Sequence, residues 1–191
     1  VRWWEVGVDG QGGGGVVLIG VGVDRVGQGC VLGVSVALSE AEVHWREFLS
    51  SLVRRGLSGV QMITSDAHEG LAAARRAVFG AVPWQRCQFH LQQNASAYVP
   101  RQELKAEVAA DIRAIFNAPD KPSAVALLEQ AVTKCRKLAS RLAEWLEQNI
   151  PEGLTVFGLP PAHRRPLAPT NRPERHTPEV TRPPRSVSIT S

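Results

Sequence analysis

The chain has 191 residues, 43% of them hydrophobic, and a formal net charge of +4. This length suits one domain with a substantial core. Its three cysteines are too few and too scattered for a disulfide framework, and we recognise neither a signal peptide nor an apolar run of about eighteen residues. We therefore expect no secreted disulfide scaffold and no membrane span, but a protein of the reducing cytoplasm.

The basic excess is confined to the C-terminal tail. From residue 160 to residue 191 six arginines accompany two glutamates, so residues 1–159 hold sixteen basic and sixteen acidic side chains. A neutral body can still carry a basic face, so the charge is only weak support for a phosphate-bearing partner. Eight of the thirteen prolines also lie in this tail. We predict that residues 159–191 form a disordered, Pro/Arg-rich tail.

The first forty residues predict three antiparallel strands. Apolar segments separated by glycine-rich links favour hairpins, and such segments lie at 2–8, 16–23 and 30–37. A helix is expected next, with Ser39 as its cap and Glu42 at the capping-box position. Gly56 is expected to end this helix.

Helices and strands then alternate. The pattern predicts a strand at 59–64, a helix at 68–79 and a short strand at 82–86, followed by helices from Leu91 onward. One helical face is marked by Leu104, Val108, Ile112 and Ile115, and a second runs through Val125, Leu128, Val132, Cys135, Leu138, Leu142 and Leu146. This order predicts an α/β fold with a ribonuclease H-like core at 1–99 and an all-helical insertion at 100–158.

Asp66 directly follows the apolar run at 59–64. In open α/β sheets functional groups gather outside the carboxyl ends of strands, so Asp66 is placed to do chemistry. The alternative is that Asp66 caps the next helix through amides near Glu69. A single carboxylate cannot support two-metal phosphoryl transfer, so a nuclease-like site would need acidic partners from other elements.

Cys87 and His90 form a Cys-x-x-His pair. Their spacing suits zinc, but the second ligand pair of a structural zinc site is not recognisable. On spacing alone, Cys87 is a core thiol in a strand, and His90 caps a helix or lines a cleft. The glycine runs near the N-terminus do not match the dinucleotide fingerprint, which argues against a nucleotide-binding α/β protein.

Several motifs together resemble the Mutator-related bacterial insertion-sequence transposases. The clearest are Thr-Ser-Asp-Ala-His-Glu-Gly-Leu at 64–71 and Gln-Arg-Cys-Gln-Phe-His at 85–90; further matching stretches are 31–33, 45–49, 99–100, 153–157 and 170–175. These transposases are DDE enzymes with a ribonuclease H-like domain, a helical insertion before the last acid, and a Cys-x-x-His signature after the second.

The resemblance implies roles for individual residues. Asp66 resembles the second catalytic acid, and Glu174, in a Thr-Asn-x-x-Glu-Arg pattern, resembles the third; both would bind Mg²⁺ in a two-metal site. Cys87 and His90 match the signature and would line the active site. Around the last acid, Asn171 and Arg175 would contact DNA.

The first acid of the family is expected immediately before Val1. Arg2-Trp3 and Asp9-Gly10 match the residues that follow this acid, whereas Asp24 occupies a turn and is a poor substitute. Pro173 stands beside Glu174, where relatives have a helix. We therefore expect a fragment truncated at both ends and inactive by itself.

The resemblance also implies the partners. They are insertion-sequence ends and target DNA, with homo-oligomerisation, at the bacterial nucleoid. The alternative that stays open is a non-catalytic DNA-binding or assembly module derived from a transposase.

Overall fold

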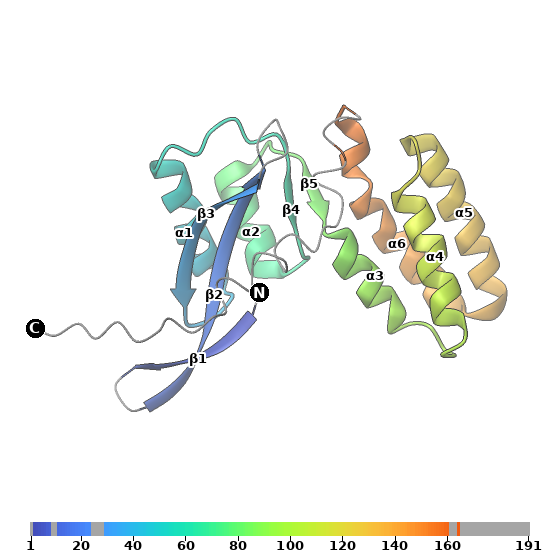
Figure 1. Cartoon of the computed structure of the whole chain (residues 1–191), viewed down its shortest axis with the longest axis horizontal. Helices are drawn as coiled ribbons and strands as arrows, with labels where there is room; N and C mark the ends of the chain where they lie inside the picture. The colour runs from blue at the N-terminus through green and yellow to red at the C-terminus, as the bar shows by residue number, and fades with distance from the viewer. Residues whose placement is uncertain (1, 9–10, 24–28, 161–163, 165–191) are drawn as a thin grey trace, which may run out of the picture.

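The computed structural model describes residues 2–8, 11–23, 29–160 and 164, and within them two small sheets and six α-helices (Figure 1). The elements are β1 (Arg2–Val8), β2 (Gln11–Val23), β3 (Gly29–Ala37), α1 (Glu42–Arg54), β4 (Ile63–Ser65), α2 (Glu69–Phe79), β5 (Trp84–Arg86), α3 (Gln88–Ser96), α4 (Leu104–Phe116), α5 (Lys121–Leu138), α6 (Ser140–Asn149) and the 3₁₀ turns η1 (Ile150–Gly153) and η2 (Thr155–Gly158). No helix among these is long and apolar enough to cross a membrane.

The three N-terminal strands form the expected antiparallel meander in the order β1-β2-β3. β2 begins at Gln11 rather than at Val16, because the glycine run pairs with β1, as in Gly12 opposite Gly7. The glycines therefore extend the strand instead of forming a long link.

One face of the meander packs on α1 and α2. Val16 and Leu18 of β2 are buried against Trp45, Phe48 and Leu52 of α1, with Leu71 and Ala74 of α2. Gly33 on β3 permits this contact, since a Cβ there would lie 2.9 Å from Leu52 Cδ2. The opposite face carries exposed aliphatic side chains, namely Ile19, Val21, Val31, Val34 and Val36.

The predicted capping box of the first helix is wrong. The helix begins at Glu42 after Ala41, so Ser39 lies too far upstream to reach the amides of the first turn. The Ser39 hydroxyl instead accepts a hydrogen bond from the Ala41 amide at 3.3 Å, and Glu42 pairs with Arg46.

β4 and β5 are parallel and are joined through α2. β4 is shorter than predicted because Gly59 has a φ of 67°, which turns the chain, and the strand begins only at Ile63. A Cβ on Gly70 would clash with the carbonyl oxygen of Glu40, so this glycine lets the first turn of α2 approach the start of α1.

The helical block has its own core. It is built from α3 to α6 with η1 and η2, and its fully buried side chains include Leu91, Ile112, Ile115, Leu142, Leu146 and Ile150. The first predicted apolar face is confirmed, with Leu104 only partly buried. The second is wrong at Val125 and Leu138, which are exposed: the buried face of α5 runs through Ala124 instead of Val125, and α5 ends at Leu138 before α6 begins a new helix.

The α/β class and the helical block are thus confirmed. No ladder between the meander and β4–β5 is present among the described strands, so the ribonuclease H-like core and the domain boundaries stay predictions. In Figure 1 the sheets with α1 and α2 lie on one side and α4 to α6 on the other, with α3 leading from β5 into the block.

Candidate functional site

Asp66 and Cys87 follow the ends of two neighbouring parallel strands. The register places Ser65 of β4 opposite Arg86 of β5, and the Cys87 amide donates to the Ser65 carbonyl oxygen at 2.6 Å. The residues that come next on each strand therefore meet at one edge of the sheet. This is the edge at which open α/β sheets collect functional groups.

The Asp66 carboxylate is partly committed to the local chain. Its Oδ1 accepts a long hydrogen bond of 3.3 Å from the His68 amide, and His68 is the N-cap of α2 without a side-chain cap. The predicted cap of α2 by Asp66 through amides near Glu69 is therefore wrong, because the carboxylate instead closes a short turn onto the His68 amide. Asp66 Oδ2 makes no hydrogen bond to any described residue, so half of the carboxylate is available to a ligand.

Ser65 fixes the backbone beside this carboxylate. Its hydroxyl donates to the Asp66 carbonyl oxygen at 2.7 Å and accepts from the Trp84 indole nitrogen at 2.9 Å. The Trp84 ring in turn lies under the Arg75 guanidinium, with 5.1 Å between Cζ and the ring centroid. β4, β5 and α2 thus hold Asp66 through side chains as well as through the strand ladder.

Cys87 lies at the N-cap of α3, not inside a strand, because β5 ends at Arg86. The prediction of a core thiol is therefore wrong, and the side chain is half-buried. Burial alone would raise the pKa of the Cys87 thiol, but interaction with the His90 side chain, backbone and charge outweighs it and lowers the pKa.

The pKa of His90 is raised, chiefly by its side-chain interaction with Cys87. Burial opposes this rise, while the negative charges of Cys87 and Asp66 add to it. His90 Nδ1 is buried and has no hydrogen-bond partner in the described part of the chain. Cys87 and Asp66 therefore both act electrostatically on His90.

Two buried glutamines join this group to the helical block, and sequence reasoning missed both. Gln85 Oε1 accepts from the Val156 amide at 2.7 Å, and Gln88 Nε2 donates to the Gly153 carbonyl oxygen at 2.8 Å. A buried amide requires a partner, but sequence cannot say which one when the partner lies more than sixty residues away. The only available signal was a polar residue in a short apolar strand.

Arg86 reinforces the same junction. Its guanidinium donates to Asn149 Oδ1 at 2.7 Å and to Glu152 Oε2 at 3.1 Å, so the last residue of β5 is bound to the end of α6 and to η1. The start of α3 is thereby fixed relative to the block that follows it.

The described residues supply only part of a metal site. Among them, no group of three or more His, Cys, Asp or Glu side chains is placed to hold a metal ion. Asp66 offers the oxygen ligand that Mg²⁺ favours, whereas Cys87 and His90 offer softer sulfur and nitrogen. Glu174, Asn171 and Arg175 lie outside the described residues, so their predicted roles stay untested.

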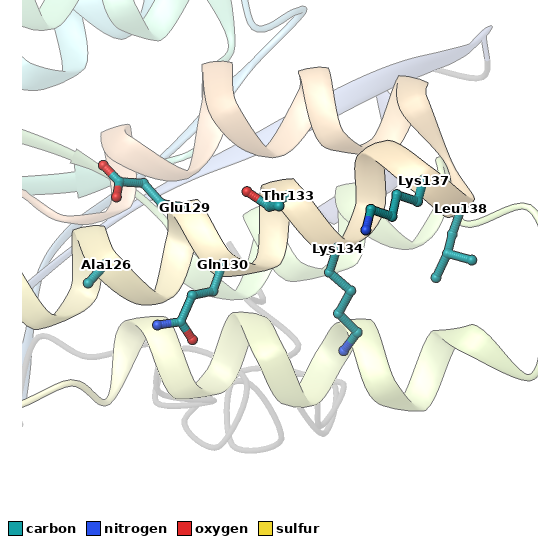
Figure 2. Close-up of a pocket in the computed structure, with 7 residues that line it drawn as sticks. All are labelled: Ala126, Glu129, Gln130, Thr133, Lys134, Lys137 and Leu138. Atoms are coloured by element: carbon teal, nitrogen blue, oxygen red, sulfur yellow. The ribbon is translucent and has the colours of Figure 1, made fainter.

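A shallow hollow of about 660 Å³ lies away from this site, along α5 (Figure 2). Lys134, which lines it, is held by Glu107 and Asp111 of α4 at 2.7 and 2.8 Å, and these hydrogen bonds raise its pKa. Its charge is therefore already compensated. The hollow has no feature that would make it a rival site.

Comparison with known proteins gives a consistent result. Residues 3–190 match the model of a family described as transposase, Mutator family. The chain is 57% identical to the transposase for insertion sequence element IS406 of Burkholderia multivorans, over 91% of this chain and 45% of that protein.

More distant relatives bear similar names. The chain is 37% identical to the ISRM5 transposase of Rhizobium meliloti, over 87% of this chain and 42% of that protein. It is 34% identical to the IS1081 transposase of Mycobacterium tuberculosis, over 86% and 40%. The chain thus spans less than half the length of these relatives.

Proposed function

The chain belongs to the Mutator family of transposases, and from that premise we propose that it is part of the catalytic domain of an insertion-sequence transposase. The substrates are the DNA ends of an insertion sequence and a target DNA. The reaction is cleavage and joining of DNA strands by phosphoryl transfer. The fold proposed for this domain is ribonuclease H-like, with the helical block as an insertion.

The placement of Asp66 is the observation that carries this proposal. It follows β4 at the edge where β5 also ends, and one of its carboxylate oxygens is unoccupied by described partners. Around it, Ser65 and Trp84 restrain the backbone. A restrained carboxylate with a free oxygen is what a metal-dependent phosphoryl transferase needs from each acidic residue.

We propose Asp66 as one Mg²⁺ ligand and Glu174 as another. When bound, two Mg²⁺ ions would supply the charge that stabilises the attacking and leaving oxygens of an in-line displacement. Cys87 and His90 border the site, and each shifts the pKa of the other: His90 lowers that of the Cys87 thiol, and Cys87 raises that of His90. Asn171 and Arg175 are proposed to contact DNA.

We further propose that the protein acts as a homo-oligomer in the bacterial cytoplasm, at the nucleoid. The relatives named above are all transposases for insertion sequence elements, which supports the choice of DNA as the partner.

A chimaeric transposase tests the role of Asp66. The segment of the Burkholderia multivorans relative that matches this chain is replaced by the sequence of this chain, and excision of a marked insertion sequence is scored in cells. Asp66→Asn should abolish excision, since the amide cannot replace a charged metal ligand. Glu129→Gln, which removes an exposed carboxylate on α5, is the matched control and should leave excision unchanged.

One outcome would count against the proposed role of Asp66, and another against the expectation about the isolated chain. Excision that survives Asp66→Asn would remove Asp66 from the catalytic residues. Strong Mg²⁺-dependent cleavage by the purified 191-residue chain would contradict the separate expectation that this chain is inactive alone.

A second candidate is a non-catalytic assembly module that pairs with intact transposase. The separate core of the helical block favours it, since none of Asp66, Cys87 and His90 belongs to that core. A pull-down with the full-length relative separates the two proposals. The assembly module would be supported if the Asp66→Asn variant still associates with the full-length relative and if excision does not depend on Asp66.

A further inference from the structure

His90 is the one ionisable side chain of α3. The helix reads Gln-Phe-His-Leu-Gln-Gln-Asn-Ala-Ser, with no Asp, Glu, Lys or Arg. Its inner face buries Gln88, Leu91 and Ala95. Its outer face presents Phe89, Gln93 and Asn94, which are all exposed to solvent. Gln93 lies one turn after Phe89, and Asn94 lies one turn after His90.

Phe89 stands beside the candidate site. α3 begins directly after Cys87, whose amide is bonded to β4 next to Asp66. The Phe89 ring contacts the His90 ring edge-on, with 5.5 Å between centroids and 69° between planes. The side chain is nevertheless 38% exposed, so part of the ring surface remains in solvent.

The amides of Gln93 and Asn94 make no side-chain hydrogen bond to any residue that the structure describes. A surface that binds DNA backbone needs cations, because phosphate contacts dominate that mode of binding. A neutral surface of free amides and an aromatic ring instead suits bases: amides bond base edges, and aromatic rings stack on unpaired bases.

We propose that this outer face of α3 contacts the bases of a DNA end, with Phe89 stacked on an unpaired base next to the strand held at Asp66. Gln93 and Asn94, further along the helix, reach the edges of neighbouring bases. The inference rests on the proposed function, because it assigns a DNA-reading surface to the same site.

Binding by the complete chain to two DNA probes tests this surface. One probe is a short blunt duplex, and the other is the same duplex with a few mismatched, unpaired bases at one end; binding is measured by fluorescence anisotropy at low salt. The wild-type chain should prefer the frayed probe. Phe89→Ala should lower affinity for the frayed probe about fivefold or more and leave the blunt probe nearly unchanged.

Two further variants control for a loss of affinity that results from unfolding rather than from the loss of the Phe89 ring. Phe89→Trp keeps a stacking ring and should retain the preference. Leu138→Ala removes an exposed apolar side chain of α5, far along the chain from the site, and should change neither affinity. The helical circular dichroism of all variants should match that of the wild type.

The outcomes separate the two proposals. If the wild type binds both probes and Phe89→Ala keeps its preference for the frayed one, the α3 surface is overturned while DNA binding stands. If the wild type binds neither probe, the proposed function fails, and the α3 inference fails with it.

Discussion

The sheet region and the helical block bury their apolar side chains in different ways. Among the residues whose burial the structure describes, the core beneath the meander has seven members, contributed by β2, α1 and α2, whereas the block encloses nineteen. The opposite sheet face leaves Val34 and Val36 more than half exposed. The block is therefore stabilised by its own packing, while β2 and β3, where the structure describes their side chains, pack on a core on one face only. The candidate site lies where the two meet.

The largest effect should come from opening a cavity in the block. Leu146 is 1% exposed, and Leu146→Ala should lower the free energy of unfolding by about 2–5 kcal/mol, because the transfer term and the cavity term add. Denaturant unfolding followed by circular dichroism measures it. Leu18→Ala makes the same change at a buried position of the sheet, and its cost is compared with that of Leu146→Ala. If Leu18→Ala costs clearly more than Leu146→Ala, the ranking of the two cores is wrong.

Breaking the junction between the regions should have the next largest effect. Gln85→Ala leaves the buried amide of Val156 without its acceptor, which should cost about 1–3 kcal/mol. Hydrogen exchange should become faster at Val156 and in η2 before it does so in α5. Gln130→Ala, on the exposed face of α5, is the control. Equal exchange in both variants would mean that Gln85 does not couple the regions.

The titration of Cys87 probes the site at the same junction. Since His90 lowers the pKa of this thiol against the opposing effect of burial, His90→Ala should raise that pKa. Less thiolate is then present near neutral pH, and alkylation of Cys87 by iodoacetamide should slow there. Mass spectrometry of the modified peptide over a pH series measures it.

Cys135 is the internal reference for that experiment. Burial raises the pKa of its thiol, so it should react more slowly than Cys87 in the wild type and be unaffected by His90→Ala. Unchanged Cys87 alkylation in the variant would show that the two side chains do not interact.

The smallest effect should come from the open face of the sheet. Val36 is 60% exposed, so Val36→Thr should change the free energy of unfolding by no more than about 0.5 kcal/mol. A loss of several times that amount would show that the face is covered in solution and would remove the contrast between the regions.

Much of the architecture could be predicted from local pattern. Alternating apolar runs gave the meander, and the apolar run that ends before Asp66 placed that residue at a strand end. Local pattern did not predict the element boundaries that depend on backbone conformation or on contacts distant in sequence. Gly59 has a left-handed backbone conformation, and β4 is therefore shorter than the apolar run predicts. The helix α3 begins at Gln88 rather than near Leu91, and the side-chain amide of Gln88 is bonded to the distant Gly153 carbonyl oxygen.

The candidate site was predictable in the same uneven way. Asp66, Cys87 and His90 were found by motif, but their closeness follows from the parallel register of β4 and β5, which the sequence does not specify. The break between α5 and α6 likewise exposed Leu138, although its apolar periodicity continued into the next helix.

The open face of β2 and β3 has a practical consequence for studying the chain. Dyes such as ANS fluoresce on apolar surface and are commonly used to detect loosely packed states. Here Ile19, Val21, Val31, Val34 and Val36 offer such a surface in the folded protein. A bright dye signal would thus accompany native tertiary structure, and near-ultraviolet circular dichroism of the buried tryptophans Trp45 and Trp145 is the safer reporter of folding.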